Sequence, residues 1–571
     1  MPWIQVYDPL GSAWLSTLAA ALPIVILLAA LAIFEVAAHR AALLGLAAAL
    51  AVSVFVYGMP AGTAAATAIY GAAYGFMPIG WIVLNAVLLY NITVETGQFE
   101  ILKSSVGRLS SDRRIQALLV AFSFGAFIEG ASGFGTPVAI CSALLIGLGF
   151  TPLYAAGLSL IANTAPVAFG AIGTPILTLA AVTGLPAQTL GAMAGRQLPF
   201  VSLLVPAWLV VTMSGWRGLR AVWPAVLVCG GTFAIVQFAW SNYVGVELVD
   251  IAGGLASIAA LAALCKVWRP AEEDTGVCAS DTKGSTPGLT PLPGSVRRSA
   301  SAEASAGHAL RAWVPWLFLS IAVIIAGLPS VKATLNQGIL APTVRVPALH
   351  RTVFRDYPVV PAPVDPAQIA DLAYRNQRAE AAVFTINWAS ATGTAILLAA
   401  IASAIYLKMS LAQFLAVVMS TFTRMRKPLA TIMLMMALGF VTRYGGTDAT
   451  LGLAFTKTGW LYPFFGTLLG WLGVALTGSD TSSNVLFGSL QKITAQQLGF
   501  NPILIVTANS TGGVMGKMID AQSIVVATAA TGQSGQEGKI LRFVFWHSVA
   551  LAAIMGVIVM LQAYVFQWMI P

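Results

Sequence analysis

The sequence is poor in charged residues. Asp, Glu, Lys and Arg make up only 9% of the 571 residues, whereas soluble domains carry roughly 25%. A chain of this size with so few charged residues cannot present a polar surface to water on all sides. The composition therefore excludes a large soluble protein. Hydrophobic residues make up 58%. Apolar runs recur along the chain, and Leu15–Ala38, Ala221–Val244 and Phe543–Met569 can each cross a hydrocarbon layer about 30 Å thick. We therefore expect an all-α polytopic membrane protein.

Cysteine and histidine are also scarce, with four of each. Cys141, Cys229 and Cys265 stand in apolar segments and Cys278 stands in a polar one, without the spacing of a metal site. We interpret them as small packing residues plus one reduced cytosolic thiol, and expect neither a metal nor a cofactor. A cleavable signal peptide is not expected, because the first apolar run is too long for one and predicts a retained helix.

The net charge of +9 comes from cations in short segments between the apolar runs. This is the positive-inside pattern, so the charge predicts orientation in a membrane and does not indicate a nucleic-acid partner. The basic clusters are Arg108, Arg113 and Arg114; Arg217 and Arg220; and Arg424, Arg426 and Lys427.

Two polar segments divide the chain. Residues 269–311 are rich in Ser, Gly, Pro and charge and predict a disordered cytoplasmic linker. Residues 332–382 mix both charges with several prolines and predict an ordered external loop. A single span, Ala312–Leu328, separates these segments, so they must lie on opposite faces of the membrane. We expect an N-terminal membrane half at 1–268, a C-terminal half at 312–571, and 12 to 14 transmembrane segments, some of them interrupted.

Two short stretches look unlike lipid-facing helices. Ala126–Ile140 and Leu476–Phe487 are rich in Gly, Ser and Thr, each contains an acid, and each is flanked by apolar residues. Non-helical backbone at membrane depth is tolerated only where protein or a watery cavity satisfies its polar groups. We predict that both stretches are helix breaks or re-entrant hairpins.

The regions that follow the two breaks resemble each other. Leu-Gly-Phe-Thr-Pro at Leu148–Pro152 matches Leu-Gly-Phe-Asn-Pro at Leu498–Pro502, and the pair Asn163-Thr164 matches Asn509-Ser510. Chance similarity between glycine-rich segments is one explanation. The other is an internal repeat, and broken helices at corresponding positions of a repeat are the best pointer to a transporter's binding site.

Broken helices suit a carboxylate substrate, because a buried anion is very costly unless it is neutralised or hydrogen-bonded. Helix N-termini present unpaired N–H groups and a partial positive charge. Nearby hydroxyl and amide groups could add donors, although Ser and Thr can also serve local backbone or helix packing. The candidate substrate-binding residues in the breaks are Ser132, Gly133, Thr136, Ser479, Thr481, Ser482, Ser483 and Asn484.

Glu129 and Asp480 are the acids within the two breaks. Acids in membrane segments are rare and usually line ion or proton pathways, so both are candidates for proton coupling. The alternative is a permanently ionised acid paired with Lys517. That lysine could instead meet the substrate carboxylate, or extend to the membrane interface. Arg196 is expected at a membrane edge, and His547 is expected to be a packing histidine.

Gly130-Ala131-Ser132-Gly133 also matches the Gly-x-Ser-Gly of intramembrane serine proteases. Such a serine needs a histidine base, and His547 is the only histidine inside an apolar span. A hydrolase would also give no reason for a second broken segment. We keep an intramembrane serine hydrolase as a remote alternative.

Long strings of the sequence, in order from one end to the other, resemble the bacterial L-lactate permease family. They are YDPLGSAWLSTLAAALPI (Tyr7–Ile24), GAFIEGASGFGTPVAI (Gly125–Ile140), LGFTPLYAAGLSLIANTAPVAFGAIGTPI (Leu148–Ile176), GRQLPF (Gly195–Phe200), WASATGTAIL (Trp388–Leu397), LGWLGVALTGSDTSSNVLF (Leu469–Phe487), ANSTGGVMGKMI (Ala508–Ile519) and LQAYVFQWMIP (Leu561–Pro571).

The resemblance implies symport of L-lactate, D-lactate or glycolate with a proton across the bacterial inner membrane. It also implies the architecture of the ion-transporter superfamily, in which hairpins with Ser-Asn-Thr-like motifs bind carboxylates. By that analogy, the pairs Asn163-Thr164 and Asn509-Ser510 join Ser483-Asn484 as candidate substrate-binding residues.

The sequence departs from the family pattern at two places. The family tends to have Asn-Tyr-Ser-Gly where Arg443 stands in VTRYGG, and a small polar residue where Asp520 follows Ile519. We expect Arg443 to pair with Asp448 near a helix end. If the Arg443 side chain instead faces the substrate-binding cavity, the family resemblance no longer indicates which 2-hydroxy acid is preferred.

We expect a secondary-active symporter of two similar halves, with its site where the hairpins meet and with lactate-like monocarboxylates, protons and lipid as its partners. A sodium-coupled carrier of other small carboxylates is the first alternative, since hydroxyl- and carbonyl-rich breaks also suit a hard cation. A channel is a further alternative. The oligomeric state and the order of substrate preference stay open.

Overall fold

A computed structural model describes residues 3–32, 34, 36–101, 109–131, 133, 135–270, 306–360, 378–533 and 536–571. Most of the predicted linker 269–311 lies outside these residues, as do Arg108, Ser132 and Cys278. The boundaries of the two halves, the linker and the external loop therefore stay predictions.

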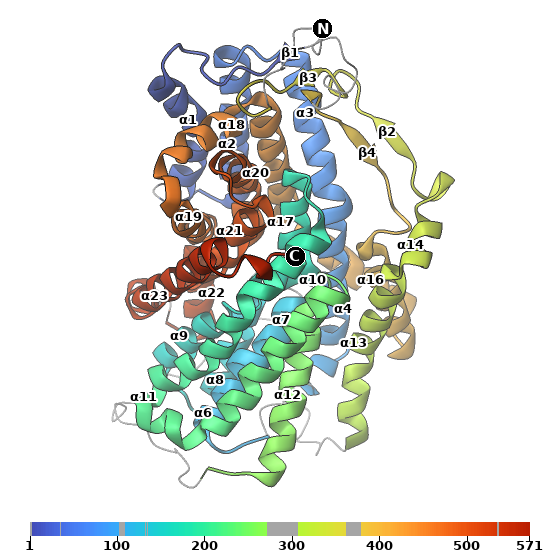
Figure 1. The fold of residues 1–571 in the computed structure, drawn as a ribbon. Coiled ribbons are helices and arrows are strands. Elements are labelled where there is room, and N and C mark those ends of the chain that lie inside the picture. The colour runs from blue at the N-terminus through green and yellow to red at the C-terminus, as the bar shows by residue number, and fades with distance from the viewer. Residues whose placement is uncertain are drawn as a thin grey trace.

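The described chain is almost entirely helical (Figure 1). The helices of the N-terminal half are α1 (Ala13–Ala32), α2 (Ala38–Ala51), α3 (Ala61–Tyr74), α4 (Trp81–Glu95), α6 (Arg113–Ala117), α7 (Gly125–Ala131), α8 (Thr136–Gly147), α9 (Pro152–Ala162), α10 (Gly170–Thr183), α11 (Ala187–Tyr243) and α12 (Val249–Val267). Those of the C-terminal half are α13 (Ala306–Gly327), α14 (Pro329–Leu335), α16 (Thr392–Tyr406), α17 (Leu411–Gly445), α18 (Thr447–Phe455), α19 (Tyr462–Thr477), α20 (Asp480–Leu498), α21 (Pro502–Gly516), α22 (Ala521–Ala530) and α23 (Glu537–Tyr564).

Nine helices in the described chain are long and apolar enough to cross a membrane, or ten if the bent pair α9–α10 is one span. The 57-residue α11 cannot be a single span. Its backbone leaves helical geometry at Gly215 and Val222, and its two arms contact each other where Ser202 donates to Gln237 at 2.7 Å. The predicted 12 to 14 segments are approached only when this second arm and the shorter apolar helices are added. The first predicted span was too long, since α1 ends at Ala32.

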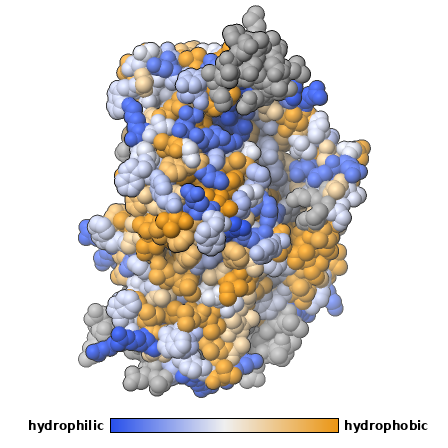
Figure 2. Space-filling model, viewed as in Figure 1, coloured by the Kyte–Doolittle hydropathy of each residue, from blue (hydrophilic) through white to orange (hydrophobic). Residues whose placement is uncertain are grey.

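The outer surface is apolar over much of the helical body. Figure 2 shows hydrophobic residues gathered around the middle and lower part of the molecule. Large apolar side chains are exposed on helices from both halves, among them Trp14, Phe55 and Leu411. Exposed aromatic and aliphatic side chains of this kind are expected where lipid replaces water around the protein.

The predicted repeat has a structural counterpart. In the N-terminal half a hairpin (α7 and α8) leads through Gly149 and Phe150 into α9, which starts at a proline, breaks after Asn163 and continues as α10. In the C-terminal half a hairpin (α19 and α20) leads through Gly499 and Phe500 into α21, which also starts at a proline, breaks after Gly516 and continues as α22. Both glycines have positive φ. Two similar halves with broken helices are therefore confirmed.

Part of the predicted external loop is tied to the N-terminus. β1 (Trp3–Ile4) pairs in parallel with β3 (Val353–Phe354). β2 (Thr343–Arg345) pairs in antiparallel with β4 (Val383–Thr385). These pairs anchor the described loop residues over α3 and α17 (Figure 1).

Two local predictions were wrong. Arg424, Arg426 and Lys427 were expected in a loop, but they lie within α17, with their side chains exposed. Arg443 was expected to pair with Asp448, but its Nη2 pairs with Glu380 Oε2 at 3.0 Å. Arg443 does lie in the last turn of α17, so the helix-end location was correct and only the partner, 63 residues away in sequence, was missed.

Candidate functional site

The tip of the first hairpin places Glu129 deep inside the protein. α7 ends at Ala131 and α8 begins at Thr136, with Gly133 and Gly135 between them at positive φ. Glu129, two residues before the end of α7, is only 4% exposed. Its Oε2 accepts a hydrogen bond from Asn163 Nδ2 at 3.2 Å. The break after α9 therefore holds the acid of the hairpin that precedes it.

The tip of the second hairpin is a single turn. Gly478, with φ of +73°, ends α19, and Ser479 is the N-cap of α20 and accepts from Ser482 N–H at 3.3 Å. Asp480 is the first residue of α20 and is 3% exposed. Its Oδ2 accepts from Ser510 Oγ at 2.5 Å and from Asn484 Nδ2 at 3.3 Å. Its Oδ1 accepts no hydrogen bond from the described residues.

Each acid lies directly against a glycine of the broken helix that follows its hairpin. A Cβ on Gly170 would stand 2.5 Å from Glu129 Oε1, and a Cβ on Gly513 would stand 2.5 Å from Asp480 Oδ1. Any side chain at either position would collide with the carboxyl group. These glycines therefore let the two helix breaks close around the acids.

Several predicted donors belong to a buried network that holds the hairpin to its neighbours. Asn484 donates to Pro175 O at 3.2 Å and accepts from Asn509 Nδ2 at 2.9 Å, while Ser483 donates to Gly470 O at 3.1 Å. Thr164, in the break after α9, donates to Ile161 O at the end of that helix. Ser483 and Thr164 therefore bind backbone carbonyls, whereas Asn163, Asn484 and Ser510 donate to the two acids.

Lys517 lies at the break between α21 and α22 and is 5% exposed. Its Nζ donates to Gly478 O at 2.7 Å and stands 3.3 Å from Asp520 Oδ2. Burial rules out the interface position considered from the sequence. The lysine ties the tip of the second hairpin to the second break, and Asp520 balances its charge.

A cavity of about 60 Å³ lies where the hairpin tips and the breaks meet. A single water needs roughly 10–15 Å³, so the cavity has room for a small polar molecule. Of the predicted site residues, Glu129, Gly133, Ser479, Asp480, Thr481 and Lys517 line it. Gln522 and the α10 break residues Gly170 and Ala171 also line it and were missed, because nothing in the local sequence distinguishes them.

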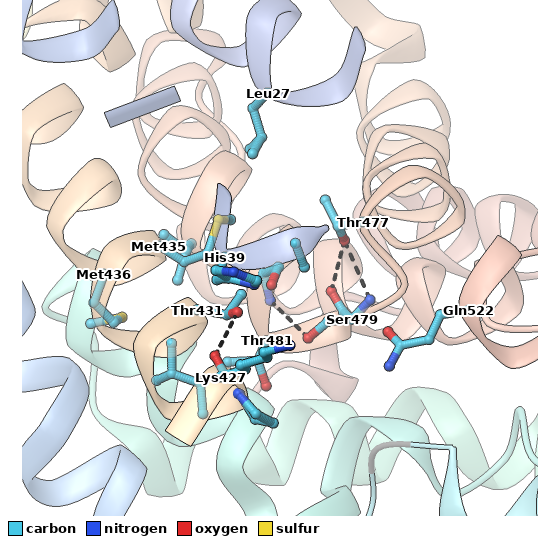
Figure 3. Close-up of a pocket in the computed structure, with 15 residues that line it drawn as sticks. Leu27, His39, Lys427, Thr431, Met435, Met436, Thr477, Ser479, Thr481 and Gln522 are labelled. Carbon is cyan, nitrogen blue, oxygen red and sulfur yellow. Dashed lines mark hydrogen bonds between the residues drawn. The ribbon is translucent and has the colours of Figure 1, made fainter. Parts of the chain in front are cut away.

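A second, larger cavity of about 300 Å³ adjoins the first and shares Ser479, Thr481 and Gln522 with it. Figure 3 shows His39, Thr431 and Lys427 on one side of this space and Ser479 and Gln522 on the other. Ser482 also lines it. We call this cavity the vestibule. It extends from the residues that it shares with the central cavity to His39 and Lys427.

The remaining predicted residues lie elsewhere. Thr136 is half-buried and lines neither the central cavity nor the vestibule. His547 accepts from Trp208 Nε1 at 3.0 Å and also lines neither, as expected of a packing histidine. Arg196 binds Asn242 and the carbonyl of Met569 near the C-terminus. No histidine is present among the described residues that line the central cavity.

The comparisons with known proteins show the family of the chain. The profile of the L-lactate permease family matches residues 16–566. The chain belongs to this family. It is 47% identical over 574 residues to glycolate permease GlcA of Escherichia coli K12, covering 100% of this chain and 99% of that protein. It is 46% identical to the L-lactate permease of the same strain over 577 residues, and 44% identical to that of Bacillus subtilis 168 over 578 residues, with 100% of each chain covered in both cases.

Membership of the L-lactate permease family places the chain among transporters. The apolar helices make it a multi-pass membrane protein, in keeping with a bacterial inner membrane. The fold is also similar to the solved structure of the Alcanivorax borkumensis YdaH transporter. The structural match covers 87% of this chain and 88% of the YdaH chain, with 13% sequence identity and a TM-score of 0.43.

Proposed function

We propose that the chain carries L-lactate and related 2-hydroxy monocarboxylates, D-lactate and glycolate included, in symport with protons. The central cavity is the binding site, and the vestibule is the route between this site and one face of the membrane. The names of the relatives support the substrate class. The size of the cavity and its mixture of hydroxyl, amide and ammonium groups suit a small hydroxy acid.

The charge balance of the central cavity supports proton coupling. Glu129 and Asp480 line the cavity, and Lys517 is the one cation among its described lining residues. Lys517 is already paired with Asp520. A lactate anion would add a further negative charge to a site from which water is largely excluded, and like charges in such a site cannot all be ionised. At least one of the two acids must therefore be protonated when the anion enters.

Glu129 is the proposed proton carrier. Its carboxyl group borders the cavity and has one amide donor, Asn163. Asp480 has two donors, Ser510 and Asn484, which stabilise its ionised form. Lactate and one proton together are neutral, so the membrane potential, worth about 2.3 kcal/mol per charge at 100 mV, would contribute nothing to accumulation. The pH gradient would supply the drive.

Uptake of labelled lactate into proteoliposomes, with proton and sodium gradients imposed separately, tests this proposal. An inward proton gradient should drive accumulation in the complete absence of sodium. If only a sodium gradient drives accumulation, the sodium-coupled alternative is correct and the proton role of Glu129 is lost.

A further inference from the structure

A third acid, Asp250, lies next to the first hairpin and outside the central cavity. It is in the first turn of α12 and is 0% exposed. Neither oxygen of its carboxyl group has a hydrogen-bond partner among the described residues. An acid at the N-cap of a helix ordinarily accepts hydrogen bonds from the N–H groups of the first turn, but the N-cap of α12 is Leu248 and Asp250 is the second helical residue. Asp250 accepts none from the described chain, so that role does not explain it.

Asp250 is packed against the residue that follows Glu129. A Cβ on Gly130 would stand 2.8 Å from Asp250 Cβ and 2.8 Å from Ile251 N, so the end of α7 and the start of α12 are in contact. Gly130 directly follows Glu129 in the sequence, so this contact brings the two acids to neighbouring positions in the fold. An unpartnered, fully buried acid is very costly in its ionised form, and its neighbour here is another acid.

The other charged groups near Asp250 are few. Glu247 lies in the loop before α12, and its Oε1 accepts from Thr392 Oγ1 at 3.3 Å. α10 and the segment Leu118–Phe124, which pack near the start of α12, contain no ionisable residue. Arg196 of α11 is held by Asn242 and Met569. No cation among the described residues neutralises Asp250 by an ion pair.

The position of Asp250 along the membrane normal follows from α12. This helix ends at Val267, just before the linker predicted to be cytoplasmic. At 1.5 Å per residue, Asp250 lies about 25 Å from that end. The vestibule opens instead beside Lys427, in the basic segment predicted to be cytoplasmic. In this orientation Asp250 lies near the outer end of its span, level with the tip of the first hairpin, whereas the vestibule lies toward the predicted cytoplasmic side.

We propose that Asp250 is the outer-side proton donor to Glu129. The two carboxyl groups are not hydrogen-bonded to each other, so the proton passes through one water molecule: Asp250 gives its proton to the water, the water gives a proton to ionised Glu129, and the negative charge moves to Asp250, which is reprotonated from the outer side past Glu247. Protons and substrate would then reach the site by separate routes. The inference rests on the proposed proton coupling and adds a residue to it.

Asp250→Asn tests the relay in full-length protein reconstituted into proteoliposomes. The change keeps the shape of the side chain and removes its exchangeable proton. Acid-driven lactate accumulation should fall roughly tenfold or more, as for loss of a proton-transferring group, and its pH dependence should change. Exchange of internal for external lactate, which needs no net proton transfer, should stay within about twofold of wild type. Asp250→Glu should restore part of the accumulation.

Ser257→Ala is the matched control. Ser257 is on the same helix, and its hydroxyl lies 2.8 Å from Ser123 Oγ at the same interface. It should leave the pH profile unchanged. If wild type responds to the proton gradient and Asp250→Asn responds identically, the relay is wrong while the proposed function stands. If wild type shows no response, the proposed function itself fails. If Asp250→Asn does not fold, Asp250→Ala, which also removes the exchangeable proton, is measured instead, and acid-driven accumulation equal to wild type in this variant overturns the relay.

Discussion

Asn163 donates a hydrogen bond from Nδ2 to Oε2 of Glu129 across 3.2 Å, joining the first helix break to the first hairpin tip. The C-terminal half contains the equivalent hydrogen bond with different residues: Ser510 donates to Asp480 across 2.5 Å. In both halves the polar pair of the broken helix therefore holds the acid of the hairpin. The two acids then face a shared cavity from opposite halves of the chain, which is the arrangement needed for one site to bind an anion and a proton together.

Thr481 is the hydroxyl best placed to contact the substrate. It lines both the central cavity and the vestibule and is half-buried. Thr481→Val should weaken lactate affinity by about 1 kcal/mol, or roughly fivefold, through loss of one hydrogen bond. Isothermal titration with lactate measures this change. The control is Ser483→Ala on the same helix, whose hydroxyl serves Gly470 O and which should alter stability more than affinity. Equal affinity losses in both variants would contradict this assignment.

Lys517 and Asp520 should have opposite effects on lactate binding. Lys517→Met removes the cation of the central cavity and should weaken affinity by about 1.5–3 kcal/mol, the range for a hydrogen bond to a charged group. Asp520→Asn frees the ammonium from its 3.3 Å partner and should leave affinity unchanged or raise it. Both are read from lactate titrations at one pH. If Asp520→Asn weakens binding as much as Lys517→Met does, the pair is structural and does not contact the substrate.

Glu380 should make the stability of the protein depend on pH in the acid range. Burial alone would raise the pKa of its carboxyl group, but Arg443 and Arg355 lower it to about 2 from an ordinary 4.5. Because the folded-state pKa is depressed, its contribution of about 3 kcal/mol is present above pH 4.5 and is lost as the pH falls toward 2.

Glu380→Gln should therefore lower the unfolding free energy at neutral pH, and the difference from wild type should shrink below pH 4.5. Denaturant unfolding of the purified protein at several pH values measures this. Asp356→Asn is the control, since Asp356 pairs with Arg378 but is 48% exposed, and exposed pairs contribute little. A difference from wild type that stays constant between neutral and acid pH would show that the two arginines do not stabilise the ionised form.

The orientation of the chain is open to a direct test. Ile339, in the predicted external loop, is 86% exposed, and Val267, at the predicted cytoplasmic end of α12, is 85% exposed. In a cysteine-free background, an impermeant maleimide added to intact cells should label Ile339→Cys and spare Val267→Cys. Labelling after the cells are opened controls for expression of both. The reverse pattern would invert the topology and place Asp250 near the cytoplasmic end of its span.

The sequence was most informative where function imposes local patterns. The stretches around Glu129 and Asp480 break an apolar run with Gly, Ser and an acid, and both were predicted as hairpins. Long-range partners leave no such pattern. Arg443 was predicted to form an ion pair with the nearby Asp448, but in the fold it pairs with Glu380. Asp250 stands at the start of an ordinary helix, and only the contact with Gly130 distinguishes it. Gln522 lines the central cavity because the chain breaks between α21 and α22, and the residues around it in the sequence do not predict that break.

The central claim is that Glu129 carries the proton while the substrate binds beside it. Glu129→Gln keeps the shape of the side chain and can still accept from Asn163, but it cannot exchange a proton. Acid-driven accumulation of lactate and exchange of internal for external lactate should be measured on the same proteoliposomes, with wild type alongside. The account predicts that Glu129→Gln abolishes accumulation and retains exchange. Normal accumulation by Glu129→Gln would contradict it and would transfer the proton site to Asp480.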